Sequence, residues 1–186
     1  MLENNVEQKP KKYAGILCHP TSFPGRYGIG DLGKGAYDFI DFLKKSKINL
    51  WQVLPLGHTG FGDSPYQPFS AFAGQPLIID LEELMEFGLL TEEDFKDMPE
   101  WNPEKVSYGD LIPFKTKMLR TAFERFADKD YEDKMSADKK IMTEYRAFVK
   151  DTFWLADYAL FMAGKDYHKG MPWYMWEDTL KAPTAA

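Results

Sequence analysis

Two short apolar runs with a helical pattern between them constrain the fold of this 186-residue chain more than any other feature. Residues 13–18 predict a short buried strand, because the run is too short for a helix and a Pro/Gly-rich stretch follows it. Residues 50–54 predict a second short strand. The apolar residues that recur at helical spacing between the two runs are Ala36, Phe39, Ile40 and Leu43. A strand, a helix and a second strand in this order predict a βαβ unit with parallel strands.

Beyond residue 80 the pattern is helical. A short helix is expected from Leu81 to Gly88, and residues 91–94 resemble a capping box with aspartate in the acidic position. Two further helices are marked by apolar residues at helical spacing, the first by Phe114, Met118, Ala122 and Phe126 and a longer one by Ile141, Tyr145, Phe148, Leu155, Ala159 and Met162. A mainly helical back half therefore follows the βαβ unit.

The pattern divides the chain into three predicted regions. Residues 1–12 are polar and are expected to form a disordered lead, residues 13–80 contain the βαβ unit, and residues 81–186 are mainly helical. A chain of this length holds one domain or part of a larger one, because domains cluster near 100 to 200 residues.

Charge and hydropathy argue against several classes of partner. The formal net charge of -6 argues against nucleic acid and anionic membranes, since both need a basic surface. The N-terminal region lacks the apolar run of a signal peptide, and no stretch approaches the roughly 18 apolar residues of a membrane span. The lone cysteine, Cys18, excludes an intramolecular disulfide and fits a reducing compartment. We expect a cytoplasmic protein with neither nucleic acid nor membrane as a partner.

A glycine motif at residues 28–33 matches the G-x-G-x-x-G pattern of dinucleotide-binding proteins. That pattern requires the glycines directly after a strand and an acidic residue about twenty positions further on. Here Pro20 and Pro24 separate the strand from the glycines, and the second strand ends without a carboxylate. We reject nicotinamide or flavin binding and interpret the glycines as a turn into a tightly packed helix.

The loop at residues 57–68 has the composition of a sugar-binding surface. It follows the carboxyl end of the second strand, which is where parallel α/β folds bind ligands. Tyr66 can cover the C–H face of a glucose ring, while Ser64 and Gln67 suit its hydroxyl groups. The alternative is that Tyr66 packs in the core and that Asp63 begins an ordinary turn. Composition alone favours that alternative.

The remaining candidates for chemistry are few. His19 ends the first strand and points to the same face as the loop, where it can donate to a hydroxyl group or serve a structural role. The other histidines, His58 and His168, are not spaced like zinc ligands, so we expect neither a metal nor another cofactor. Glycosyl transfer needs two carboxyl groups, but Asp31 and Asp63 both lie at positions that carboxylates occupy for structural reasons. The chain offers no convincing catalytic pair.

Four segments together resemble the amino-terminal region of the 4-α-glucanotransferases, the amylomaltase or disproportionating-enzyme family. They are residues 16–25 (ILCHPTSFPG), 27–33 (YGIGDLG), 51–57 (WQVLPLG) and 62–67 (GDSPYQ). Weaker resemblance extends to about Trp176. The chain departs from the family in having His58 where proline is frequent and Gln75 where asparagine is frequent.

The resemblance implies the amino-terminal part of a (β/α)8 (TIM) barrel, an α/β fold, with a mainly helical insertion subdomain. It implies retaining transfer of α-1,4-glucan segments between maltooligosaccharides, with an aspartate nucleophile and a glutamate acid/base. In this family the tyrosine at the position of Tyr66 stacks on the sugar, the serine at Ser64 contacts the glucan, and the residues at Tyr108 and Phe61 are associated with a further glucan-binding groove. The substrate-binding residues expected on these grounds are Tyr66, Ser64, Asp63, Gln67, His19, Phe61 and Tyr108.

The resemblance also implies that the catalytic carboxylates lie beyond the equivalent of residue 186. We therefore expect the chain to be inactive alone and to need the remaining carboxyl-terminal part of the barrel as its partner. A non-catalytic carbohydrate-binding or regulatory protein is the first alternative. A helical interaction module with an aromatic core is the second.

Overall fold

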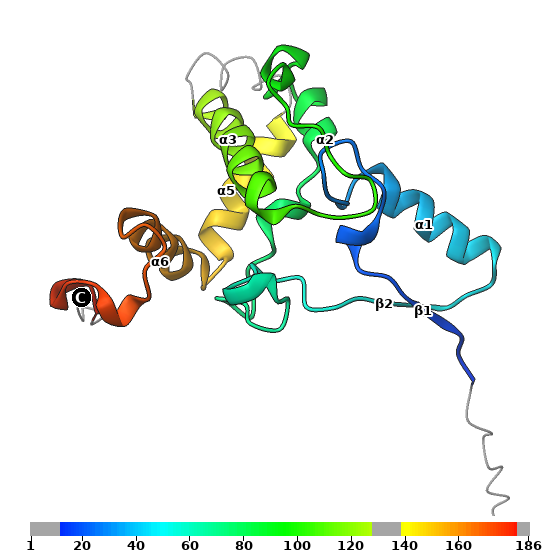
Figure 1. The fold of residues 1–186 in the computed structure, drawn as a ribbon, viewed down its shortest axis with the longest axis horizontal. Coiled ribbons are helices and arrows are strands. Elements are labelled where there is room, and N and C mark those ends of the chain that lie inside the picture. Colours follow the sequence, from blue (N-terminus) through cyan, green and yellow to red (C-terminus); the bar gives the residue numbers. More distant parts are fainter. Residues whose placement is uncertain (1–11, 128–138, 182–186) are drawn as a thin grey trace, which may run out of the picture.

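The computed structural model describes residues 12–127 and 139–181 and has a mixed α/β structure (Figure 1). Figure 1 shows α1 near one end of the molecule and α6 near the other. The elements in chain order are β1 (Gly15–Leu17), the 3-10 helix η1 (Pro20–Ser22), α1 (Lys34–Lys45), β2 (Leu50–Gln52), η2 (Phe61–Asp63), η3 (Pro76–Ile78), α2 (Leu81–Glu86), η4 (Glu92–Phe95), α3 (Tyr108–Phe126), α5 (Lys139–Asp151), α6 (Leu155–Tyr167), η6 (Trp173–Met175) and α7 (Asp178–Lys181). The predicted lead lies, except for Lys12, outside the described residues.

The predicted βαβ unit is confirmed. Strands β1 and β2 are parallel, with Ile16 opposite Trp51, and α1 lies between them in the chain. Helix α1 packs on β2 through aromatic rings, because the centroids of Phe39 and Trp51 are 5.3 Å apart. The indole nitrogen of Trp51 also donates to the carbonyl oxygen of Cys18 at 2.7 Å, which ties β2 to the end of β1.

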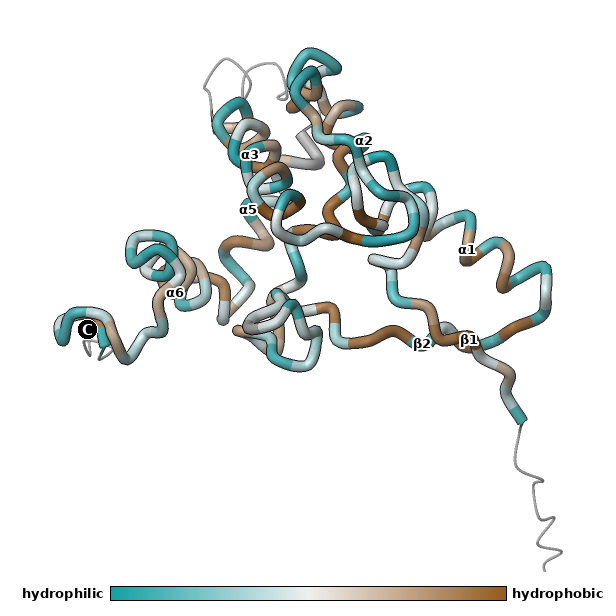
Figure 2. The backbone as a smooth tube through the Cα atoms, in the orientation of Figure 1, coloured by the Kyte–Doolittle hydropathy of each residue, from teal (hydrophilic) through white to brown (hydrophobic). Residues whose placement is uncertain are grey.

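The expectation that the first strand is buried is wrong. Leu17 on β1 is 58% exposed and Leu50 on β2 is 50% exposed, although Figure 2 shows both strands as hydrophobic segments. Side chains alternate between the two faces of a strand, so Leu17 and Leu50 lie on the face opposite Trp51 and α1. The sheet contains two strands in the described residues, and no further strand or helix among them covers that second face. The predicted apolar face of α1 is also partly open, because Ile40 is 46% exposed while Leu43 is buried.

The main core lies between the chain segment that precedes α1 and the helices α2 and α3. Tyr27 is 2% exposed and Leu81 is fully buried, so the segment and α2 share one apolar interior. The buried residues of this cluster are Tyr27, Leu81, Leu89, Leu90, Phe95, Phe114, Met118 and Ala122. The predicted apolar face of α3 is therefore confirmed, because Phe114, Met118 and Ala122 are buried in this cluster and Phe126 packs against it.

Glycine at position 28 is required by its neighbour in this core. Gly28 has a φ of +78°, and a Cβ atom there would come within 2.4 Å of the indole ring of Trp101. The backbone therefore passes directly against an aromatic ring, which only glycine permits at this φ. The predicted turn into a closely packed helix is confirmed at Gly33, which directly precedes α1 and where a Cβ atom would lie 2.2 Å from the carboxylate of Asp80.

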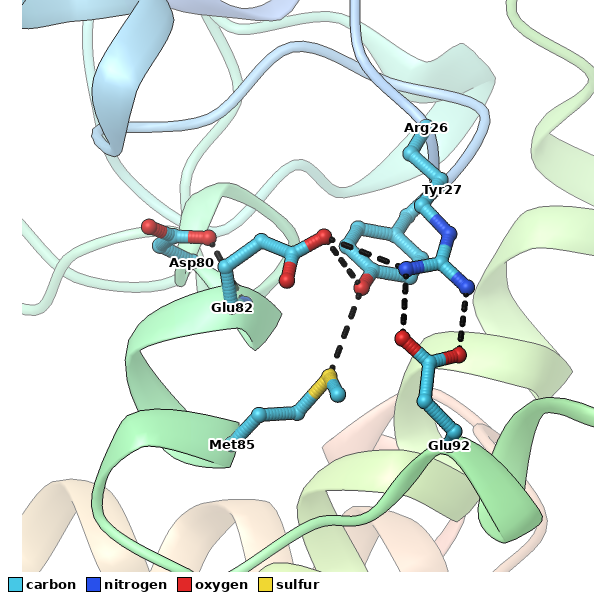
Figure 3. A network of polar contacts seen from close by, with 6 residues as sticks. All are labelled: Arg26, Tyr27, Asp80, Glu82, Met85 and Glu92. Atoms are coloured by element: carbon cyan, nitrogen blue, oxygen red, sulfur yellow. Dashed lines mark hydrogen bonds and ion pairs between the residues drawn. The ribbon is translucent and has the colours of Figure 1, made fainter.

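Polar contacts reinforce the same segment (Figure 3). The hydroxyl group of Tyr27 donates to Glu82 of α2 at 2.7 Å, and burial together with this bond raises the pKa of Tyr27. The guanidinium group of Arg26 donates to both carboxylate oxygens of Glu92 at 3.0 and 2.7 Å. Because Arg26 is 43% exposed, this ion pair adds little stability beyond the buried contact of Tyr27.

Lys115 is a buried cation that periodicity did not reveal. Its side chain is fully buried on α3, and its ammonium group donates to the carbonyl oxygen of Ile79 at 2.8 Å. Burial lowers the pKa of Lys115 to about 8, while the charges of Asp31 and Asp80 oppose that shift. This bond links α3 to the chain before α2 beside the apolar cluster, because the ammonium group lies 5.9 Å from the centre of the Tyr27 ring.

The predicted single long helix at residues 141–162 is wrong. The structure has two helices, α5 and α6, separated at residues 152–154. The ring of Trp154 stacks with that of Phe72 at 6.4 Å, and Phe153 meets Phe72 edge-on at 5.2 Å. The chain changes direction at these contacts with a loop that is distant in sequence. Helical periodicity alone predicts one uninterrupted helix here.

The predicted capping box at residues 91–94 is confirmed at η4. Asp94 accepts hydrogen bonds from the backbone N–H and the hydroxyl group of Thr91 at 2.8 and 3.0 Å. Arg125 of α3 donates to both carboxylate oxygens of Asp94 at 2.7 and 2.8 Å. These bonds, led by Arg125, lower the pKa of Asp94 to about 2. One aspartate therefore caps η4 and joins it to α3.

We expect Asp94→Asn to lower the free energy of unfolding by about 1–2 kcal/mol at pH 7, measured by urea denaturation. A carboxylate with a depressed pKa in the folded state stabilises above its ordinary pKa, and this contribution is lost as the pH falls toward 2. The difference between variant and wild type should therefore shrink between pH 4 and pH 2. A difference that is unchanged over this interval would contradict the role of the charged pair.

Candidate functional site

The loop after β2 turns back on itself. Gly57 and Gly74 form an isolated antiparallel bridge, and the backbone N–H of Gln75 donates to the carbonyl oxygen of Leu56 at 2.7 Å. The tip of the loop contains η2, in which Asp63 has a φ of +54°. The two ends of the loop are thus joined, and its tip projects as a defined turn.

Gly60 allows the two halves of this loop to touch. A Cβ atom at Gly60 would lie 2.7 Å from the carbonyl oxygen of Gln67 and 3.2 Å from the ring of Phe69. Both distances are shorter than a normal carbon contact, so the returning half of the loop depends on glycine at this position.

A cleft of about 170 Å³ lies between this loop, the end of β1 and the start of α3. It brings together three of the residues predicted from the sequence, namely His19, Asp63 and Tyr108. His19 precedes η1, Asp63 ends η2 and Tyr108 begins α3. The cleft is lined by His19, Thr21, Ser22, Ile29, Leu54, Pro55, Gly57, Thr59, Asp63, Pro65, Gln75, Leu77 and Tyr108.

The titratable groups of the cleft favour neutral ligands. Burial lowers the pKa of His19, so its imidazole is uncharged at neutral pH. Its Nδ1 atom is buried and has no hydrogen-bond partner within the described part of the chain. Burial, and then the charge of Asp63, raises the pKa of Tyr108, which keeps that phenol protonated. A neutral imidazole, a phenol and one carboxylate are groups that hydrogen-bond hydroxyl groups.

Tyr66 lies outside the cleft and is 67% exposed. The alternative in which this ring packs in the core is therefore wrong, because most of the ring faces solvent. Ser64 accepts a hydrogen bond from the backbone N–H of Tyr66 at 3.3 Å, as in an ordinary serine turn. Gln67 is exposed and does not line the cleft. The side chain of Phe61 lies outside the described part of the structure.

Gln75 and Thr59 belong to the cleft but were missed in the sequence. Gln75 is 7% exposed, and its side-chain nitrogen donates to the hydroxyl group of Thr59 at 3.0 Å. Its side-chain oxygen accepts from the backbone N–H of Leu77 at 3.4 Å. The sequence offered one signal for this role, which is that Gln75 stands at the end of the loop, directly before the apolar residues 76–79.

Two further features of the described residues bear on the kind of site. They contain no group of three or more His, Cys, Asp or Glu side chains that could hold a metal ion. None of the helices in residues 12–127 and 139–181 has both the length and the apolar character needed to cross a membrane. Asp63 is the one carboxylate among the residues lining the cleft.

Comparison with known proteins gives consistent matches. A sequence model described as 4-alpha-glucanotransferase matches residues 18–186. The 4-alpha-glucanotransferase of Thermus thermophilus is 48% identical over 163 residues, which cover 87% of this chain and 30% of that protein. The 4-alpha-glucanotransferase of Synechocystis is 44% identical over 168 residues, which cover 90% of this chain and 32% of that protein.

A solved structure agrees with these matches. Amylomaltase from Streptococcus agalactiae in complex with acarbose is 35% identical to this chain and superimposes with a TM-score of 0.76. The superposition covers 90% of this chain and 32% of that protein. The chain thus spans about a third of the length of the relatives that it matches.

The close approach at Gly60 gives a test of the loop geometry. Gly60→Ala should lower the free energy of unfolding by about 1–3 kcal/mol, because the added methyl group meets the backbone at Gln67. The matched control in the same loop is Gly74→Ala, where nothing lies within 4 Å of the added atom. It should change the free energy by less than about 0.5 kcal/mol. Equal effects of the two substitutions in urea denaturation would contradict the described loop.

Proposed function

The chain belongs to the 4-alpha-glucanotransferase family, and we propose that it forms the substrate-binding front part of an enzyme that transfers α-1,4-glucan segments between maltooligosaccharides. The observation that carries this proposal is the convergence of His19, Asp63 and Tyr108 on one small cleft below the loop that exposes Tyr66. These residues come from three separate parts of the chain. The matches to relatives named 4-alpha-glucanotransferase support the same reaction class.

Tyr66 supplies an aromatic surface for a sugar in this proposal. A glucose ring has one face of C–H groups, and an exposed phenol ring can cover that face without displacing other packing. Ser64 and Gln67 stand on either side of Tyr66 in the chain and offer a hydroxyl and an amide group to the rim of the sugar. The complex of the amylomaltase neighbour with acarbose supports a glucan as the ligand.

The cleft supplies polar contacts for the sugar hydroxyl groups. The unpartnered Nδ1 atom of His19 gains a hydrogen bond if a hydroxyl group or a bridging water reaches it. Asp63 accepts from sugar hydroxyl groups, and Tyr108 donates to or accepts from them. At about 170 Å³ the cleft is smaller than a typical ligand pocket of about 300–1,000 Å³, so it suits a small part of a glucan chain.

Glycosyl transfer with retention needs a nucleophilic carboxylate and a second carboxyl group as acid and base. The cleft contributes one carboxylate, Asp63, among the residues that the structure describes. We assign the nucleophile and the acid/base to a remaining carboxyl-terminal part of the protein. In the double displacement, the nucleophile forms a glycosyl-enzyme while the acid protonates the leaving sugar, and the same group then deprotonates the acceptor hydroxyl.

The same carboxyl-terminal part would complete the fold. Strands β1 and β2 expose Leu17 and Leu50, and further parallel strands and helices would cover these side chains. The proposed architecture is a (β/α)8 barrel whose first strands are β1 and β2, with residues 81–186 as a mainly helical insertion. We propose a cytoplasmic location on the basis of the acidic charge and the single cysteine.

The direct test compares the full-length protein that carries these residues with the 186-residue chain. The full-length protein should convert maltotriose into glucose and longer maltooligosaccharides, measured by glucose release and chromatography. The 186-residue chain should show no conversion. Conversion by the short chain would show that it contains a carboxylate pair. A full-length protein that binds maltooligosaccharides without converting them would favour a non-catalytic carbohydrate-binding or regulatory role instead.

The role of Tyr66 gives a second prediction. In the full-length protein, Tyr66→Ala should weaken maltoheptaose binding about tenfold, since the stacking surface is lost. Tyr66→Phe keeps the ring and should stay close to wild type. Tyr37→Ala removes a tyrosine that is 70% exposed on α1 and serves as a matched control with unchanged affinity. Isothermal titration calorimetry measures all three, and equal affinities of Tyr66→Ala and Tyr37→Ala would contradict the stacking role.

A further inference from the structure

The loop that carries Tyr66 is held from outside the cleft by helix α6. The ring of Phe69 lies 5.9 Å from that of Phe161 in an edge-on contact, and the ammonium group of Lys165 lies 4.7 Å from the centre of the Phe69 ring. His58 approaches the same helix, because its Nδ1 atom is 3.4 Å from the hydroxyl group of Tyr158.

Residues His58 and Phe69 lie on opposite sides of the loop tip in the sequence and touch each other. Their ring centroids are 5.2 Å apart. One helix therefore holds both the outgoing and the returning half of the loop. We name these five residues, His58, Phe69, Tyr158, Phe161 and Lys165, the α6 clasp.

We propose that the α6 clasp positions the sugar-binding loop, so that His58 and Phe69 are positioning residues for glucan binding although neither lines the cleft. This inference rests on the proposed function of that loop. It assigns to α6 a role in substrate affinity that is distinct from a direct contact with the sugar.

The path from the clasp to the cleft is short. Thr59, which lines the cleft, follows His58 directly in the chain. The ring of Phe69 lies against Gly60, where a Cβ atom would be 3.2 Å from it. A shift of Phe69 or His58 therefore displaces the backbone that leads to Asp63 and Tyr66. The loop tip between them has few other anchors, because Tyr66 and Gln67 are exposed.

The break between α5 and α6 provides a further contact between the loop and α6. Phe72, which follows the clasp residues in the loop, packs against Phe153 and Trp154 at the junction of α5 and α6. Trp154 also contacts Tyr158 of the clasp, with ring centroids 6.0 Å apart. Phe72 of the loop therefore packs against the start of α6, while residues further along α6 contact His58 and Phe69 of the same loop.

His58 holds its place as a neutral ring. Burial and the charge of Lys165 lower its pKa, and the charge of Asp166 opposes this shift. Arg120 of α3 lines the cavity next to His58 and lies 3.9 Å from Asp166. The clasp therefore combines aromatic packing with a polar contact that needs no charge on the imidazole.

The test uses the full-length protein with two clasp variants, Phe69→Leu and His58→Ala. Two controls change exposed residues of α6 outside the clasp, Leu160→Ala (73% exposed) and Tyr167→Phe (76% exposed). For maltoheptaose, each clasp variant should raise KM about three- to tenfold with little change in kcat. Both controls should keep the wild-type KM. A clasp residue with a merely structural role would lower the melting temperature and the active fraction and leave KM unchanged, which would overturn the proposal.

Backbone hydrogen exchange gives a readout that does not depend on activity. Peptides that cover residues 57–69 should exchange faster in both clasp variants than in wild type, and peptides of α1 should not change. Unchanged exchange in the loop would overturn the clasp even if wild type transfers glucans. Faster exchange in a protein whose wild type neither binds nor converts maltoheptaose would uphold the physical clasp and refute the proposed function.

Discussion

The burial of Tyr27 among the helices is the constraint on which the rest of the structure depends. The segment between β1 and α1 could cross the surface as an ordinary loop, but Tyr27 is 2% exposed and donates to Glu82 of α2. The backbone beside it passes directly under Trp101 at Gly28. The chain segment that joins the parallel strand pair to the helical part is therefore itself buried in the core. Its packing sets how these two parts are placed relative to each other.

The cleft follows from this arrangement. The anchored segment carries His19 at its beginning, and α3, which packs on the same apolar cluster through Met118, carries Tyr108 at its first position. The loop after β2 adds Asp63 from the other side. His19 and Tyr108 are remote in sequence, and both reach the cleft because their segments pack on buried residues. The loop that carries Asp63 has no residue in this apolar cluster, and His58 and Phe69 on either side of its tip contact α6 instead.

Local features of the structure could be predicted from the sequence, while features created by contacts between distant segments could not. The parallel strand pair and the capping box of Asp94 follow from patterns of a few residues. The break between α5 and α6 depends on Phe72, which lies far away in the chain, so helical periodicity continued across it. The exposure of Leu17 depends on how much of the sheet is covered, which a single apolar run does not reveal. The loop around Tyr66 was identified by its resemblance to a known family, because its composition alone favoured an ordinary turn. The position of Asp63 and Tyr108 on one cleft and the hydrogen bond of Gln75 to Thr59 required the fold.

The central claim is that this part of the protein holds a glucan through Tyr66 and the cleft while the reacting carboxylates come from elsewhere. A crystal structure of the full-length protein with acarbose tests it most directly. The account predicts a sugar-like ring stacked on Tyr66, polar contacts from the cleft of His19, Asp63 and Tyr108, and two carboxyl groups from beyond residue 186 at the scissile position. Acarbose bound away from Tyr66, or bound with its reacting carboxylates supplied by residues 1–186, would contradict it.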